Sequence, residues 1–257
     1  MEVHHHPQIH HNPKPWKEYF LEFVMIFLAV TMGFFAESLR EHINDNARAK
    51  EFAISMCIDL KEDTASLVKY SKRIHFAAAN IDTLFNLLSV YDPQQIPTGK
   101  LYWYGLFGGL PALFSPHDAT LLEMKSSGSL RYFSNSKINR LVAGYDQLLQ
   151  SFKLMDEHQQ GIYTEVRKTR AQLFEFKFND AANTVAQRMY TNFQQSSIDS
   201  FIKTNPPMLS NDKVLFNQYV EMVRSRFLKT QANLGDSLLR HATFLINVLK
   251  TEYNLNN

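Results

Sequence analysis

Five of the ten histidines lie within the first eleven residues of the chain, where they could bind a metal ion. Neutral imidazole is a good ligand for zinc, nickel and copper ions, so a His-rich tract of this kind can hold a transition metal. The alternative is a solvated polar tail whose positive charge falls as the pH rises through about 6.5. The predicted metal ligands are His4, His5, His6, His10 and His11. No other cofactor is expected.

A single carboxylate, Glu22, lies within an otherwise apolar stretch of sequence. An ionisable side chain at membrane depth is energetically costly and usually marks a functional position. Steps of four, three and four residues place Glu22 on one helical face with Ile26, Ala29 and Gly33. Small residues four apart allow two helices to approach closely. We therefore predict a membrane-helix interface, where Glu22 either hydrogen-bonds at its edge or pairs with a cation of a partner protein.

An aromatic and glycine-rich segment runs from Leu101 to Phe114 and contains 14 uncharged residues. It is too short to span a bilayer and too apolar for an ordinary surface loop. We expect a loop over residues 93–117 that covers the end of a helical bundle and buries its rings. The alternatives are a surface that docks a partner, the wall of a ligand pocket, or a loop that dips into a membrane. The aromatic residues concerned are Tyr102, Trp103, Tyr104, Phe107 and Phe114.

The sequence contains no familiar arrangement of catalytic residues. His117-Asp118 lacks the further His and Asp that a metal phosphohydrolase requires, and His241 lies on an apolar stripe, as a core histidine does. The HExxH, GxSxG and GxxxxGK[ST] motifs are missing. The one cysteine, Cys57, excludes an internal disulfide framework and a thiolate-rich metal site. We therefore predict that the protein is not an enzyme.

Charge and composition indicate a folded protein without affinity for nucleic acid. Lys and Arg number 27 against 25 Asp and Glu, which leaves a formal net charge of only +2. The small basic cluster of Arg167, Lys168 and Arg170 is expected on a solvated helix face. Hydrophobic residues make up 45% of the 257 residues, which is ample for a core.

The distribution of helix-breaking residues predicts an all-α fold. Residues 34–92 contain no Gly or Pro, and neither do residues 162–205. A helix from Phe34 to Tyr91 would be about 87 Å long. Its apolar residues recur every seven positions, which is typical of a coiled-coil or bundle seam: Leu60, Leu67, Ile74, Ile81 and Leu88. Further helices are expected over residues 120–127, 135–177, 180–203 and 211–253, packed as an antiparallel up-and-down bundle.

The start of this long helix is predicted to cross a membrane once. Residues 23–36 are uncharged and mostly apolar on all helical faces, and Trp16 and Tyr19 lie where interfacial aromatic residues belong. The expected organisation is a His- and Pro-rich tail over residues 1–17, a transmembrane helix over 18–37, and an extramembrane helical domain over 38–257. The usual signal-anchor arrangement then places the short tail inside the cell and the domain outside the cytoplasm.

Two stretches resemble a known group of proteins. One is the opening Met1-Glu2-Val3-His4-His5-His6-Pro7, and the other is Lys125-Ser126-Ser127-Gly128-Ser129-Leu130. Together they resemble uncharacterised, single-span, membrane-anchored helical proteins of Bacteroidota. The resemblance implies the inner membrane of a Gram-negative cell. It implies no activity, and it implies that the early histidines are native.

These features together predict a membrane-anchored helical scaffold or interaction protein. Its partners would be the membrane and either further copies of itself or another inner-membrane protein, to which it would be an accessory subunit. The alternative is a ligand-sensing or stator-like protein that uses Glu22. A short tail, one span with an acidic residue and a large external domain resemble the layout of stator and energy-transducing proteins of the ExbD, MotB and GldM kind.

Overall fold

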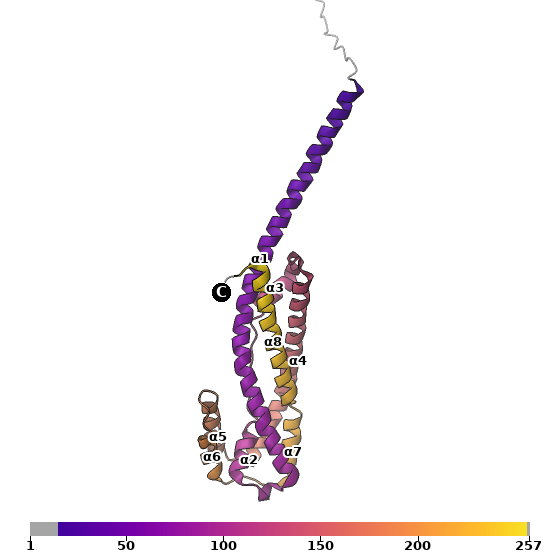
Figure 1. Ribbon diagram of the computed structural model, residues 1–257. Helices are drawn as coiled ribbons and strands as arrows, with labels where there is room; N and C mark the ends of the chain where they lie inside the picture. The colour runs from indigo at the N-terminus through magenta and orange to yellow at the C-terminus, as the bar shows by residue number, and fades with distance from the viewer. Residues whose placement is uncertain (1–14, 256–257) are drawn as a thin grey trace, which may run out of the picture. The chain divides into compact units, whose positions relative to one another are not determined.

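The computed structural model describes residues 15–255, and this part of the chain is all-α (Figure 1). Eight α-helices and two short 3-10 helices lie within the described residues. The α-helices are α1 (Trp16–Val90), α2 (Thr98–Leu106), α3 (Ala119–Ser127), α4 (Ser136–Leu173), α5 (Phe176–Met189), α6 (Gln195–Lys203), α7 (Lys213–Arg224) and α8 (Leu228–Tyr253). The 3-10 helices are η1 (Pro93–Gln95) and η2 (Ser129–Tyr132). The predicted all-α class is thus confirmed.

The chain divides into two compact units, with the boundary between Lys50 and Glu51. The described residues of the N-terminal unit form the first part of α1, after Pro15. The C-terminal unit contains the rest of α1 and all the other helices. The two units are described separately below.

In the C-terminal unit, α1 packs against the later helices through its predicted apolar stripe. Tyr70 on this stripe contacts Phe152 of α4 edge-on, with 5.2 Å between ring centroids. Gly235 of α8 lies so close that a Cβ atom there would be 2.6 Å from the Tyr70 ring. The seam is therefore a bundle seam within one chain. Its buried members include Ala53, Met56, Leu60, Leu67, Ile74, Ala77, Ile81 and Leu84.

Helix α8 runs antiparallel to both α1 and α4, as predicted. Asp236 contacts Ser71 of α1, whereas Lys229, earlier on α8, pairs with Asp82, later on α1. Against α4, Glu252 reaches Asn135 at the start of the helix. Between α1 and α4, the residue numbers of the contacting pairs increase together. Tyr145 contacts Asp63, and seven residues later on both helices, Phe152 contacts Tyr70. These two helices are parallel, so the bundle is not a simple up-and-down one.

Parallel neighbours need a connection that returns along the bundle, and residues 107–118 provide it. This segment has no helical structure, and from Pro111 to Asp118 its residues alternate between exposed and half-buried. Phe114 packs against Phe152 with 5.3 Å between ring centroids, and His117 reaches Asp63 of α1. The segment predicted as a loop over 93–117 therefore contains η1 and α2 in its first part, and only its second part is this extended crossover.

Two of the predicted helices are interrupted. The helix expected over 180–203 is divided into α5 and α6 by residues 190–194, and the one expected over 211–253 ends at Arg224 and resumes at Leu228. Between α7 and α8, Phe227 adopts a left-handed conformation (φ 48°) and is 54% exposed, while Arg226 and Leu228 on either side are buried. In a continuous helix, the side chains of residues 226 and 228 would point about 200° apart around the helix axis, so both could not face the same core.

Candidate functional site

The four residues predicted to form a membrane-helix interface lie on the exposed surface of the N-terminal unit. Ile26 is 67% exposed, and Glu22, Ala29 and Gly33 are also exposed. A Cβ atom built at Gly33 would meet nothing within 4 Å. Among the described residues, only α1 has a stretch long and apolar enough to cross a membrane, and none of that stretch is buried. The surface of this unit therefore has the apolar character that a bilayer or another apolar helix would cover.

The aromatic residues predicted near position 103 are mostly core residues of the C-terminal unit. Tyr102, Trp103 and Phe107 are each 0–1% exposed, whereas Tyr104 and Phe114 are half-buried. The Trp103 indole donates a hydrogen bond to Asn80 Oδ1 at 2.9 Å. The Tyr102 hydroxyl donates to the carbonyl of Pro207 and accepts from the backbone N–H of Glu175. The rings of these three residues are buried inside the unit, and the polar atoms of Tyr102 and Trp103 have hydrogen-bond partners there. The three residues therefore hold α2 against its neighbours.

A buried arginine, Arg226, stabilises the end of α2 and the turn after it. Arg226 is 1% exposed and donates hydrogen bonds to the carbonyls of Phe107, Gly108 and Leu110. Its guanidinium also lies 4.3 Å from the centroid of the Tyr163 ring. Burial lowers the pKa of this arginine, and the carbonyl dipoles and ring face compensate part of the cost. Sequence reasoning missed Arg226, because nothing in its local pattern distinguishes it from a surface arginine.

Arg170 is buried, contrary to the prediction for the basic cluster. It was predicted on a solvated helix face, but it is 8% exposed and donates to Asn179 Oδ1. Its guanidinium lies 5.9 Å from the centroid of the Phe174 ring, and burial lowers its pKa. Arg167 and Lys168, which precede it on α4, are exposed as predicted. The three cations therefore do not form one surface cluster.

A polar network centred on Asp63 joins α1, α4 and the crossover. Asp63 is 0% exposed; one carboxylate oxygen accepts from the backbone N–H of His117 at 2.7 Å, and the other accepts from the Tyr145 hydroxyl at 2.5 Å. The His117 ring has Nδ1 at 3.0 Å from Asp63 and Nε2 at 3.0 Å from Glu62. Carboxylates at both ring nitrogens favour the doubly protonated imidazolium. The network therefore ties the crossover to the bundle most firmly when His117 is charged.

The groups around His117 come from each element packed against it. On α1 they are Asp59, Glu62 and Asp63; on α4, Tyr145 and Lys153. Lys153 pairs with Asp118, the residue after His117, at 2.5 Å. The pKa of His117 lies above its ordinary value, chiefly because of the hydrogen bond to Asp63 and also because of the nearby Glu62. Burial and the bond to Asp63 raise the pKa of Tyr145.

This arrangement predicts a pH-dependent contribution of His117 to stability. A pKa that folding raises adds stability that is complete below the unfolded value of about 6.5 and is lost as the pH rises through the folded value. We expect His117→Gln to lower the midpoint of urea unfolding more at pH 6 than at pH 9. His158→Gln, at an exposed position on α4, is the matched control and should show no such difference. An equal loss for His117→Gln at both pH values would contradict this assignment.

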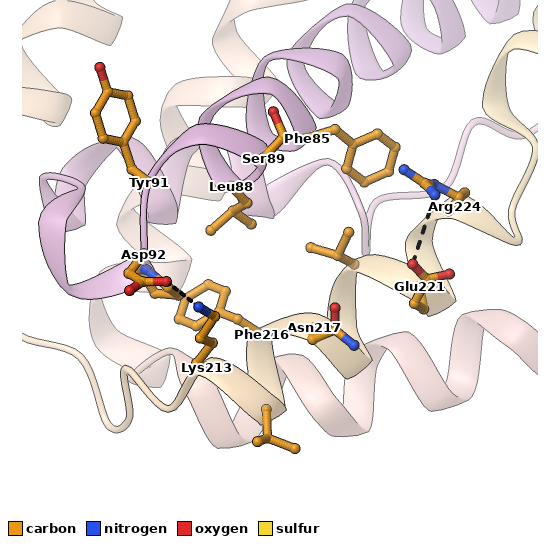
Figure 2. Close-up of a pocket in the computed structure, with 13 residues that line it drawn as sticks. Phe85, Leu88, Ser89, Tyr91, Asp92, Lys213, Phe216, Asn217, Glu221 and Arg224 are labelled. Carbon is orange, nitrogen blue, oxygen red and sulfur yellow. Dashed lines mark ion pairs between the residues drawn. The ribbon is translucent and has the colours of Figure 1, made fainter.

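A pocket of about 490 Å³ lies between the end of α1 and α7 (Figure 2). Its middle is apolar and includes Leu88 and the buried Phe216. An ion pair lies on either side: Lys213 Nζ is 2.5 Å from Asp92 Oδ1, and Arg224 Nη1 is 3.8 Å from Glu221 Oε1. Since each cation has an acidic neighbour, the pocket has no net charge. It could accept a neutral apolar group, and sequence reasoning gave no sign of it.

The remaining candidate ligands do not come together in the part of the chain that the structure describes. No group of three or more His, Cys, Asp or Glu side chains that could hold a metal is found among residues 15–255. His4, His5, His6, His10 and His11 lie outside the described residues. Cys57 is buried, and burial raises the pKa of its thiol. His241 is half-buried and lies 2.7 Å from the carbonyl of Leu141, as a structural histidine would.

Comparison with known proteins gives no further guide: no protein-family model, curated protein or solved structure matches the chain. Function must therefore be argued from the residues of this chain.

Proposed function

We propose that the protein is a single-pass, membrane-anchored helical scaffold that self-associates through its membrane helix. The observation that supports this most strongly is the apolar surface of the N-terminal unit. Phe34 and Phe35 are each 72% exposed, and Met32 is 70% exposed, although such side chains normally lie in a core. In a bilayer these faces would be covered by lipid. The domain after the span would lie in the periplasm, with the short tail inside the cell.

Self-association is proposed because one face of this helix carries two small residues, one turn apart. Among residues 15–255, nothing beyond the neighbouring turns of the helix lies within 4 Å of a Cβ atom built at Gly33, and Ala29 lies one turn away. A second helix could approach there until backbones touch, which is how small residues promote association in lipid. Glu22 lies on the same face, near the end of the span, where its carboxyl group could reach the interface. The apolar stripe of α1 beyond Lys50 does not contribute, because it is buried within the C-terminal unit.

The experiment compares two isoleucine substitutions on different faces of the span. Gly33→Ile should reduce the oligomeric fraction of the purified protein in mild detergent, measured by multi-angle light scattering. Because a Cβ at Gly33 meets nothing within 4 Å, the substitution should not disturb the single chain, and its effect would report on a partner helix. Thr31→Ile, about 200° away around the helix, should leave the oligomer intact. A monomeric wild-type protein under these conditions would exclude the homo-oligomer.

A further inference from the structure

A second groove in the C-terminal unit, here called the basic groove, lies between α1 and the end of α5. Its volume is about 460 Å³, within the range of small-molecule sites. Three of its lining residues are cations, Lys69, Lys72 and Arg73, all exposed on α1. None of the ion pairs found among residues 15–255 involves them. No acidic side chain from the described part of the chain lines the groove.

Apart from Thr191, the rest of the basic groove is lined by aromatic and apolar side chains. Phe76 of α1 and Tyr190 after α5 contact each other edge-on, with ring centroids 6.2 Å apart, and Met189 lies beside them. The Arg73 guanidinium lies 5.0 Å from the centroid of the Tyr190 ring, so one cation is already held against an aromatic face. A tyrosine is neutral near pH 7, and burial raises the pKa of Tyr190 further. The groove therefore combines an apolar wall with three positive charges.

The contrast with the pocket of Figure 2 indicates what kind of ligand fits. That pocket is similar in size, but both of its cations have acidic neighbours. In the basic groove the positive charge is not balanced by the lining, so an anion would gain attraction that a neutral molecule would not. We propose that the basic groove binds a small organic anion, with a sulfonate, carboxylate or phosphate group attached to an aromatic or aliphatic body. This site is independent of membrane anchoring.

Naphthalene-2-sulfonate represents this class, and naphthalene-2-sulfonamide is its neutral counterpart. Both would be titrated into the full chain in dodecyl maltoside micelles by saturation-transfer NMR, with empty micelles as the blank. We expect saturable binding of the sulfonate with a Kd of about 1 mM or tighter. The sulfonamide should bind about tenfold more weakly, and raising the salt from 50 to 500 mM should weaken only the sulfonate.

Substitutions locate the site. Lys72→Glu combined with Arg73→Glu should weaken sulfonate binding about tenfold or more, because it reverses two of the three lining charges. Lys61→Glu is the matched control, since Lys61 is exposed on the same helix but does not line the groove; it should change binding less than twofold. Helical circular dichroism would verify that both variants are folded. The proposal would be overturned by absent saturable binding, by equal binding of the two probes, or by equal losses in the two variants.

Discussion

Replacing Trp103 with alanine is expected to lower the free energy of unfolding by about 3–5 kcal/mol, as for other large buried aromatic residues. Trp103 is 1% exposed, and its ring contacts Phe107 and Phe201 at centroid distances of 5.3 and 6.4 Å. The substitution would leave a cavity beside α2 and deprive Asn80 Oδ1 of its indole donor. Both effects act in the same direction, because an orphaned buried acceptor adds a further cost.

The control is the adjacent residue of the same helix. Tyr104 is half-buried, so Tyr104→Ala should cost clearly less than Trp103→Ala. Both variants would be compared by urea unfolding followed by circular dichroism. If Trp103→Ala left the free energy of unfolding nearly unchanged, α2 would not be part of the core. The aromatic segment would then be better explained as a surface that docks a partner.

The failure to predict α2 as a helix has a specific physical cause. A glycine-rich segment predicts a loop, but the glycines of α2 allow close packing instead: a Cβ at Gly99 would clash with the carbonyl oxygen of Ile202, and one at Gly105 would be 2.9 Å from the Phe174 ring. Gly128 behaves in the ordinary way, with a φ of 69° at the end of α3. A glycine required for packing and one required for a turn look the same in a single sequence.

The long helices could be predicted because their evidence is local. Residues 34–92 lack helix breakers and show a heptad stripe, and α1 covers nearly all of them. The stripe does not reveal what covers it, however, since a coiled coil and an intramolecular bundle need the same pattern. The contact of Tyr70 with Phe152 and its approach to Gly235 decide for the bundle.

The polar networks could not be predicted, because their partners are distant in sequence. Asp63 and Tyr145 are 82 residues apart, and Arg226 and the carbonyl of Gly108 are 118 apart. His117 looked like half of an incomplete metal motif, whereas its actual partners are two carboxylates on α1. For Asp63, Tyr145 and His117, it is the parallel arrangement of α1 and α4, with the crossover beside them, that brings the groups together.

The largest effect is expected from charges placed within the predicted span. An arginine near the centre of a membrane helix costs about 2.5–3.5 kcal/mol on insertion scales, so Leu28→Arg with Val30→Arg should oppose insertion by about 5–7 kcal/mol. Leu28 and Val30 are 52% and 53% exposed, so the arginines would create no clash within the chain. The double variant should therefore fold its C-terminal unit and lose its anchor. Leu28→Ala with Val30→Ala is the matched control and should retain the anchor.

Alkaline carbonate extraction of membranes tests most directly whether the start of α1 is a membrane anchor, since it releases peripheral proteins and retains those with an inserted helix. The wild-type chain and the alanine control should remain in the membrane pellet, and the arginine variant should appear in the soluble fraction. Release of the wild-type chain into the soluble fraction, to the same extent as the arginine variant, would show that the apolar start of α1 is not a membrane anchor.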